Sequence, residues 1–240
     1  MLFEWFIALV VIVLSSVVQT AVGFGLAIIA VPILVLIDPN MVPAPIVIVA
    51  FFQLWLNLYA HRAHVNWKPL LWAFVGRVPG TVAAVLALRL TGEAGLQWFI
   101  GLAVLMAVII SLSKWRLALN RRNHFFAGMA SGFTGTTSAI GGPPIALLYQ
   151  HQTGDTVRAN LSAYFIVGSV MSIIGMGAGG LLTMQSWLYA GAFLIPTFVG
   201  VWIGLRVKHL LKPTFMRPAM LILCGTCAVV VLAQAVRLTF

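Results

Sequence analysis

Acidic residues are almost missing from this sequence. The 240 residues include only four Asp and Glu, and charged residues of both signs make up 8% of the chain, whereas 62% is hydrophobic. A soluble domain of this size could not cover so much apolar surface with so few charges, so we expect the chain to lie in lipid. The four acids, Glu4, Asp38, Glu93 and Asp155, fall near the ends of apolar runs. No carboxylate is therefore expected at the membrane midplane to relay protons.

Cysteine and catalytic motifs are equally scarce. The only two cysteines, Cys224 and Cys227, lie in an apolar stretch without a polar partner to activate a thiolate. Packing of small residues is the simpler interpretation, and a membrane thiol redox protein is the alternative from another class. His61 and His64 have nearly the spacing of metal ligands but lie in a basic loop, so we predict no metal site and no cofactor. No Ser/His/Asp or Gly-x-Ser-x-Gly arrangement supports hydrolysis, and no enzyme is expected.

The abundant charge is positive, with a formal net charge of +10. The basic residues fall at the ends of apolar runs, as cytoplasmic loops require, and no soluble module is present to carry them into a nucleic-acid groove. We therefore expect the partners to be a lipid bilayer and a small anion, and no nucleic acid. The sequence leaves a monomer and a homodimer equally open.

Apolar runs divide the chain into eight segments, and a membrane-spanning helix takes about 20 such residues. Almost nothing remains for an extramembrane domain, which predicts an all-α integral membrane protein. The segments are Leu2–Ile37, Val42–Ala60, Pro69–Leu90, Leu96–Leu112, His124–Tyr149, Val157–Leu182, Trp187–Val207 and Phe215–Leu238.

Glycine and proline interrupt the first and fifth segments at matching places. The first interruption reads QTAVGFGLAIIAVP from Gln19 to Pro32, and the second reads SGFTGTTSAIGGPP from Ser131 to Pro144. Interrupted apolar segments in corresponding places of two halves are the best sequence indication of a transporter's binding site. We therefore predict a first transmembrane repeat over 1–113, a cytoplasmic connector over 114–123 and a second repeat over 124–240, each with about four apolar segments.

Positive charge decides between two topologies. If every segment crosses the membrane once, the basic residues at the segment ends and in the connectors (all except Arg77) divide seven to six between the two sides. If each broken segment instead enters and returns as a re-entrant hairpin, eleven fall on one side and only Arg89 and Arg237 on the other. The second arrangement satisfies the positive-inside rule. It predicts two inverted repeats, with both termini outside a bacterial inner membrane.

The motif from Ser131 to Pro144, with its degenerate copy near the N-terminus, resembles the sulfite exporter TauE/SafE family of membrane transporters. The resemblance covers essentially the whole chain in length, segment count and repeat. It implies transport of sulfur-containing anions such as sulfite or organosulfonates, often outward.

The helix breaks are the candidate binding site. Backbone N–H groups at the start of a half-helix carry positive partial charge that suits an anion, and glycine lets the anion approach them. Tight helix packing is the alternative use of these glycines. The second break supplies the candidate contacts Gly135, Thr136, Thr137, Ser138, Gly141, Gly142 and Pro143, and the first supplies Gln19, Thr20, Gly23 and Gly25.

Arg77 is the most informative single residue, because it lies well inside an apolar run. A buried arginine costs about 2.5–3.5 kcal/mol on insertion scales and is a functional hypothesis by default. Its planar fork suits an oxyanion, although snorkelling to the cytoplasmic end or pairing with backbone carbonyls would also explain it. Gln53, Asn57 and Asn160 either line a polar path or bond between helices.

The predicted mechanism is efflux by alternating access. A monovalent anion gains about 2.3 kcal/mol per 100 mV on leaving a negative-inside cell, so export needs no coupling ion. An anion channel is the nearest alternative.

Overall fold

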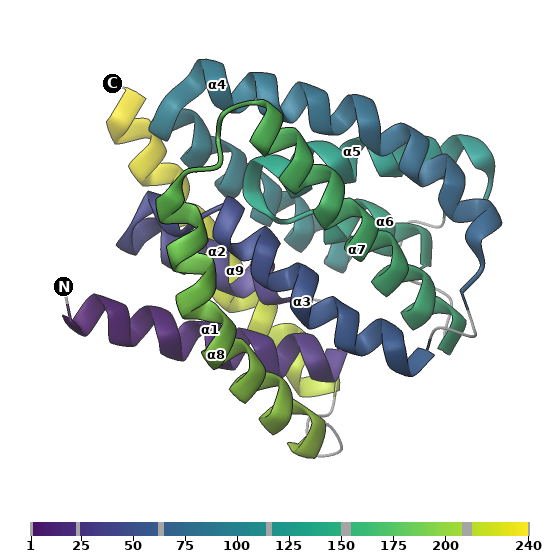
Figure 1. Ribbon diagram of the computed structural model, residues 1–240, viewed down its shortest axis with the longest axis horizontal. Helices are drawn as coiled ribbons and strands as arrows, with labels where there is room; N and C mark the ends of the chain where they lie inside the picture. Colours follow the sequence, from purple (N-terminus) through teal and green to yellow (C-terminus); the bar gives the residue numbers. More distant parts are fainter. Residues whose placement is uncertain are drawn as a thin grey trace.

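The computed structural model describes residues 2–22, 25–61, 65–113, 117–149, 155–207 and 213–239. These residues form helices and no strand, which confirms the all-α prediction (Figure 1). Five stretches are long and apolar enough to cross a membrane: Phe3–Thr20, Trp67–Gly92, Ala94–Leu112, Ala159–Ala178 and Met184–Val207. The elements are α1 (Leu2–Val22), α2 (Leu26–Ile37), η1 (Pro39–Met41), α3 (Ala44–His61), α4 (Trp67–Leu112), α5 (Arg121–Ser138), α6 (Gly142–Tyr149), α7 (Asp155–Ala178), α8 (Met184–Val207) and α9 (Pro213–Thr239).

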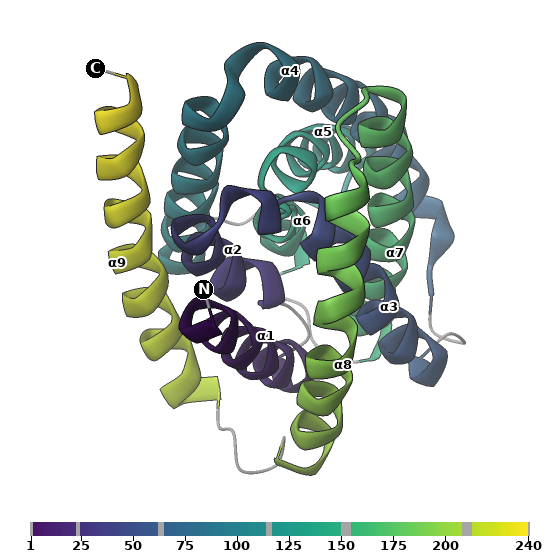
Figure 2. The same cartoon turned by 60° about the vertical axis from the view of Figure 1, so that its left-hand side comes forward.

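The third and fourth predicted segments are continuous in α4, which turns at Gly92. This glycine has a φ of 59° and a ψ of −152°, a conformation that residues with a side chain rarely adopt. Figure 2 shows the turn at the top of the bundle, with α9 beside the second half of α4. The corner lets one unbroken stretch of sequence supply two antiparallel spans.

Both predicted helix breaks are present. The first separates α1 from α2, and Gly25 at the start of α2 has a φ of 134°. The second separates α5 from α6, where Ala139 ends α5 in the left-handed region with a φ of 59°. Both breaks therefore contain a backbone conformation that stops a helix.

Each broken segment folds back as a hairpin, because its two ends meet. At the first hairpin, Trp5 lies 5.3 Å from the ring of Tyr189, and the hydroxyl of Tyr189 donates to Asp38 just beyond α2. Burial opposes ionisation of Asp38, but hydrogen bonds from Tyr189 and Asn40 outweigh it and hold the pKa of this carboxyl below its usual value. At the second hairpin, His124 Nε2 lies 3.2 Å from the hydroxyl of Tyr149. The re-entrant position of these hairpins in a membrane stays a prediction.

The two halves of the chain pack crosswise into one bundle. Helix α1 packs along α8, and the first half of α4 packs along α5. Helix α3 packs along α7, and the second half of α4 along α9. Every one of these pairs joins a helix of the first predicted repeat to a helix of the second. Figure 1 shows both chain termini at the same end of the bundle. This reciprocal pairing is what two related repeats would give, and their inversion stays a prediction.

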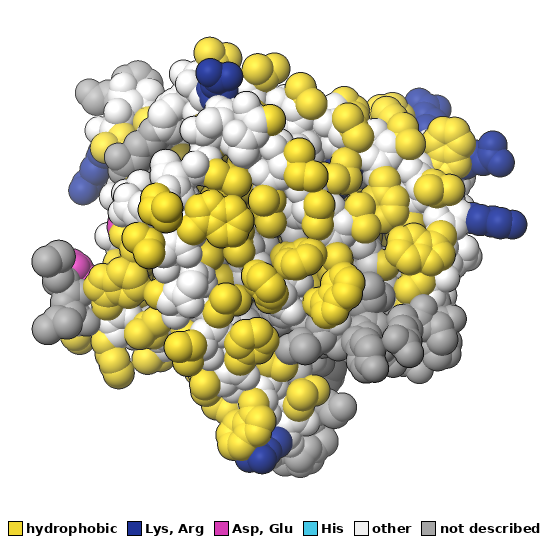
Figure 3. Space-filling view, in the orientation of Figure 1, with side chains coloured by type: hydrophobic (Ala, Val, Ile, Leu, Met, Phe, Trp, Pro, Cys, Tyr) yellow, Lys and Arg dark blue, Asp and Glu magenta, His cyan; other side chains and the backbone are white. Residues whose placement is uncertain are grey.

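Glycines bring the paired helices into backbone contact. A Cβ at Gly128 of α5 would lie 2.0 Å from the carbonyl oxygen of Ala73 in α4, and one at Gly80 of α4 would lie 2.1 Å from that of Met129 in α5. In the α1–α8 pair, a Cβ at Gly200 would lie 2.5 Å from the carbonyl oxygen of Val13. Close helix packing is therefore the use of these glycines. Apolar side chains cover most of the face seen in Figure 3, and Lys and Arg lie at its margins.

We predict that Gly128→Val destabilises the bundle while Gly191→Val does not. The valine at 128 has to displace the backbone of α4, whereas a Cβ at Gly191 meets no heavy atom within 4 Å. Overpacking against backbone lowers the melting temperature by about 5 °C or more. Thermal unfolding of both variants in one detergent measures the difference, and equal shifts would contradict the close α4–α5 contact.

Candidate functional site

Arg77 of α4 lies inside the bundle with 4% of its surface exposed. Its Nη1 donates to Ser131 Oγ of α5 at 3.1 Å and to Tyr164 Oη of α7 at 3.2 Å. Its Nη2 donates to Ser172 Oγ of α7 at 3.2 Å. The guanidinium carbon also lies 5.3 Å from the centroid of the Tyr164 ring. The side chain thus neither snorkels to the surface nor bonds to a backbone carbonyl through these groups.

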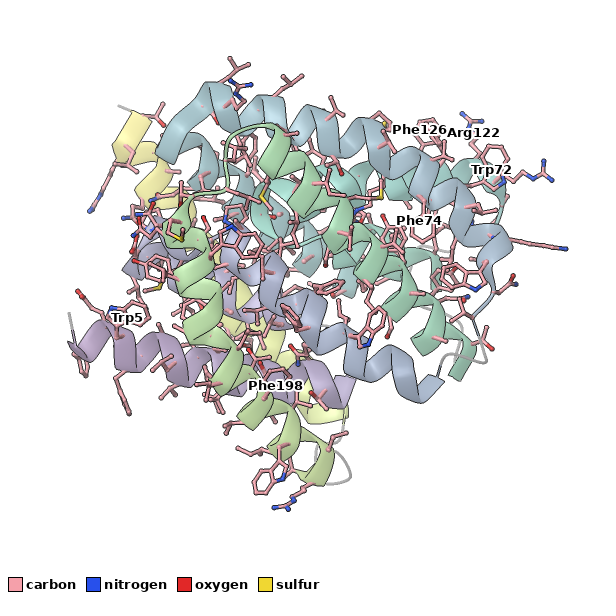
Figure 4. All side chains as sticks on the ribbon, viewed as in Figure 1. Trp5, Trp72, Phe74, Arg122, Phe126 and Phe198 are labelled. Atoms are coloured by element: carbon pink, nitrogen blue, oxygen red, sulfur yellow. The ribbon has the colours of Figure 1, made fainter. Side chains whose placement is uncertain are left out.

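Two glycines make room for the guanidinium. A Cβ at Gly168 of α7 would lie 2.5 Å from Arg77 Cζ, and one at Gly135 of α5 would lie 2.9 Å from Nη2. Tyr164 is held in turn by Phe74, whose ring stacks on it at 5.5 Å, and Figure 4 labels Phe74 among the inward side chains of α4. The position of the guanidinium is therefore fixed from three helices.

The charge of Arg77 has no counter-charge among the described side chains, because its partners are all neutral hydroxyls. Its Nε is buried and has no hydrogen-bond partner. Asp155 and Glu93, whose side chains are not described, lie nine residues before Tyr164 on α7 and sixteen after Arg77 on α4. At about 1.5 Å per helical residue, Asp155 lies roughly 13 Å along α7 from Tyr164, and the turn at Gly92, just before Glu93, lies roughly 22 Å along α4 from Arg77. A buried cation without an anion is costly, so the site favours an anionic ligand.

A cavity of about 80 Å³ connects Arg77 to both helix breaks. A cavity of 10–15 Å³ on this measure holds roughly one water, so this one takes a few waters or one small oxyanion. Figure 2 shows α2 and α6 in the middle of the bundle. The cavity is lined by Gln19, Gly25, Leu26, Ala27, Ile28, Val47, Ala50, Leu54, Arg77, Gly135, Ala139, Ile140, Gly141, Gly142, Phe165 and Ser169.

At each helix break, one side chain forms a hydrogen bond to the backbone beside the cavity. Gln19 Oε1 accepts a hydrogen bond from the amide of Leu26 at 3.0 Å, which ties the end of α1 to the start of α2. Ser131 Oγ, which accepts from Arg77, donates to the carbonyl oxygen of Gly141 at 2.5 Å. At the start of α6 the amide of Gly142 has no partner within the helix, and the prolines that follow it have no N–H to offer. At the second break, the amide of Gly142 therefore lies beside the part of the cavity that Gly135 and Gly141 line.

The structure brings six of the predicted site residues to this cavity: Arg77, Gly135, Gly141, Gly142, Gln19 and Gly25. Thr136 does not line the cavity, but its hydroxyl lies 2.8 Å from Ser172 Oγ, which accepts a hydrogen bond from Arg77. The other described candidates do not line the cavity. Gly23 and the side chain of Asn57 lie outside the described residues.

The candidates away from the cavity have structural bonds. Thr137 and Ser138 donate to carbonyl oxygens one turn back in α5, and Thr20 does so in α1. Gln53 Nε2 donates to the carbonyl oxygen of Ser16 at 3.1 Å, and Asn160 Oδ1 accepts from the amide of Asn66 at 2.7 Å. Pro143 is buried within the first turn of α6. Only the contacts of Gln53 and Asn160 match the alternative in which polar residues bond between helices, because Thr20, Thr137 and Ser138 bond within their own helices.

Two residues of α7 that meet Arg77, Gly168 and Ser172, were missed by the sequence analysis as site residues. Tyr164, Gly168 and Ser172 are spaced four apart, so they lie on one face of the helix, and that face meets Arg77. Asn160 continues the same spacing one turn earlier. The signal in the sequence was this four-residue spacing of small and hydroxyl-bearing residues.

The described residues contain no group of three His, Cys, Asp or Glu side chains that could hold a metal ion. His64 lies outside them, as does the side chain of Cys224. Cys227 is a half-buried free thiol of α9. The described residues that line the cavity beside Arg77 belong to α1 to α7 and the turns between them, so Cys227 of α9 is not among them.

An all-helical bundle with five apolar spans and a cation buried beside two helix breaks defines a multi-pass membrane protein with an internal polar site. The family model described as sulfite exporter TauE/SafE matches residues 7–231, and the chain belongs to this family. The resemblance seen in the sequence is thereby confirmed. Comparison with curated proteins and with solved structures gave no match.

We predict that Ser131→Ala lowers stability more than Thr134→Val does. The change at 131 leaves the carbonyl of Gly141 and one N–H of Arg77 without their partner inside the bundle, at about 1–3 kcal/mol for each unsatisfied group. Thr134 bonds only to Ala130 within its own helix and is the matched control. Thermal unfolding should show a loss of about 3 °C or more for Ser131→Ala. A larger loss at 134 would contradict the bridging role.

Proposed function

We propose that this protein is a transporter that exports small monovalent sulfur oxyanions, such as sulfite in its singly charged form or organosulfonates. The family is described as a sulfite exporter, which supports the class of cargo. The observation that carries the proposal is the buried guanidinium of Arg77, held by neutral hydroxyls beside a cavity that both helix breaks line.

The charge of the site favours a single negative charge on the cargo. Arg77 is the one charged residue among those lining the cavity, so a monovalent anion leaves the occupied site neutral. Arginine binds oxyanions through paired N–H groups, and the Nε of Arg77 has no partner of its own. The amide of Gly142, at the start of α6, adds the positive partial charge of a half-helix start beside the same cavity.

The two hairpins suit alternating access. One wall of the cavity comes from the break between α1 and α2, and the other from the break between α5 and α6. The ends of the first hairpin meet at Tyr189 and those of the second at the His124–Tyr149 contact. Movement of one hairpin and its partner helix against the other would open the cavity to one side of the membrane at a time. We place both termini outside a bacterial inner membrane, as the positive-inside rule favours.

We predict that Arg77→Gln strongly lowers sulfite flux through the reconstituted protein without loss of insertion. Each hydrogen bond to a charged group is worth about 1.5–3 kcal/mol, so flux should fall about tenfold or more. Flux of radiolabelled sulfite in proteoliposomes measures it, with Arg89→Gln as the control, because Arg89 is an exposed arginine of the same helix. Normal flux in Arg77→Gln would remove the residue from the site.

A second variant separates the position of the guanidinium from its charge. Gly168→Ala keeps the charge, but the new Cβ would lie 2.5 Å from Arg77 Cζ and push the guanidinium away. Flux should fall while the folded protein is retained, since the end of a flexible side chain can move. Gly177→Ala on the same helix is the matched control, because its Cβ would make only an ordinary contact of 3.5 Å with Leu182.

We predict that flux follows membrane potential alone. The described residues that line the cavity include no carboxylate to carry a coupled proton. A potential of 100 mV acting on one charge is worth about 2.3 kcal/mol, roughly a 50-fold ratio at equilibrium. Proteoliposomes with an imposed potential should show saturable sulfite flux that a pH gradient does not drive. A requirement for a proton or sodium gradient would contradict export without coupling, and flux that never saturates would indicate a channel.

A further inference from the structure

A second cavity, of about 350 Å³, lies at the end of the bundle where α4 and α5 begin. It is lined by Lys68, Pro69, Leu71, Trp72, Leu119, Asn120, Arg121 and His124. It shares no lining residue with the cavity beside Arg77. The transport site therefore does not account for it.

The cavity is strongly basic. Lys68 and Arg121 line it, and Arg122 follows directly on α5, and all three side chains are exposed. Figure 3 shows Lys and Arg side chains gathered at this end of the molecule. The lining residues include no Asp or Glu. Two or three adjacent cations without a carboxylate make a site for a group with more than one anionic oxygen.

Aromatic rings hold the arginines beside the cavity. Arg121 lies over the ring of Trp72 at 5.5 Å, and Arg122 lies over the ring of Phe126 at 5.9 Å. Figure 4 shows Trp72, Arg122 and Phe126 side by side at the start of α4 and α5. Stacking of this kind fixes the guanidinium planes before a ligand arrives.

The floor of the cavity is rigid. His124 is 1% exposed, with Nδ1 at 2.8 Å from the carbonyl oxygen of Asn120 and Nε2 at 3.2 Å from Tyr149 Oη. Asn120 caps α5 by accepting from the amide of Asn123 at 2.8 Å. Both ring nitrogens of His124 are thus engaged, and the cations on the rim are the groups left to meet a ligand.

Exposed apolar side chains continue from the cavity along the outside of the bundle. Trp67, Leu71 and Trp72 are 51%, 57% and 40% exposed, and Phe126 is 50% exposed. Tryptophan at a helix end is typical of the membrane interface, with the polar headgroups on one side and acyl chains on the other. A ligand that fits both parts has an anionic head and apolar chains.

We propose that this cavity binds the phosphodiester headgroup of an anionic phospholipid, with Lys68, Arg121 and Arg122 on the phosphate and the acyl chains along Leu71 and Phe126. Basic pockets between membrane helices at the cytoplasmic side recognise lipids of this class. His124 joins the cavity to Tyr149 at the end of α6, so the bound headgroup stabilises the end of the second hairpin at which α5 begins and α6 ends.

The test is thermal unfolding of the full-length protein in a neutral detergent with added lipid. Phosphatidylglycerol should raise the melting temperature of the wild type by several degrees more than phosphatidylcholine does, and K68A/R121A/R122A should lose that difference. Arg89→Ala should keep it, because Arg89 is an exposed arginine of the same helix, 21 residues from Lys68 and about 31 Å away along the helix. Native mass spectrometry of the same samples should show the anionic lipid retained on the wild type and on Arg89→Ala, and lost from K68A/R121A/R122A.

Three results would overturn the proposal. The wild type could show no preference for the anionic lipid, or the triple variant could keep the preference. Inorganic phosphate alone could also give the same stabilisation as the lipid, which would make the cavity a site for free anions. The first result needs no variant, so the proposal can fail even if the triple variant does not fold.

Discussion

A positive charge buried without a negative partner is the constraint on which this structure depends. The guanidinium of Arg77 is 4% exposed, and its partners are the hydroxyls of Ser131, Tyr164 and Ser172. Neutral oxygens satisfy hydrogen bonds but leave the charge itself unbalanced in a medium of low dielectric. In the function that we propose, an incoming anion neutralises this cation, and occupancy of the cavity then stabilises the bundle.

The bundle supports that charge by bringing helices closer than ordinary side chains allow. Gly128 and Gly80 put the backbones of α4 and α5 in contact, and Gly168 lets α7 pack flush against the guanidinium. The same close approach gives Ser131 its two roles, since one hydroxyl accepts from Arg77 and donates to Gly141 at the break. The hydroxyl of Ser131 thus links the guanidinium of Arg77 to the backbone turn at Gly141. A shift in the position of either group therefore alters the hydrogen bonding of the other.

The all-α class, both helix breaks and the burial of Arg77 beside them could be predicted from the sequence alone. Helix breaks show in sequence because glycine and proline act locally, and Arg77 stands out because charge is rare in an apolar run. The hydroxyl residues were harder to assign. Thr137 and Ser138 bond back to their own helix, while Ser131 and Ser172 reach Arg77, and only the relative rotation of packed helices decides between these outcomes. Asn160 was a candidate on the same face of α7, but it lies one turn beyond the cavity, beside Asn66.

The most direct test of the central claim is an experimental structure of the protein with selenite, an electron-dense analogue of sulfite. The account predicts density for one oxyanion in the cavity, within hydrogen-bond distance of the Arg77 guanidinium and facing the amide of Gly142. Selenite bound elsewhere, with Arg77 still held only by its three hydroxyls, would show that the guanidinium has a structural role and would contradict the account.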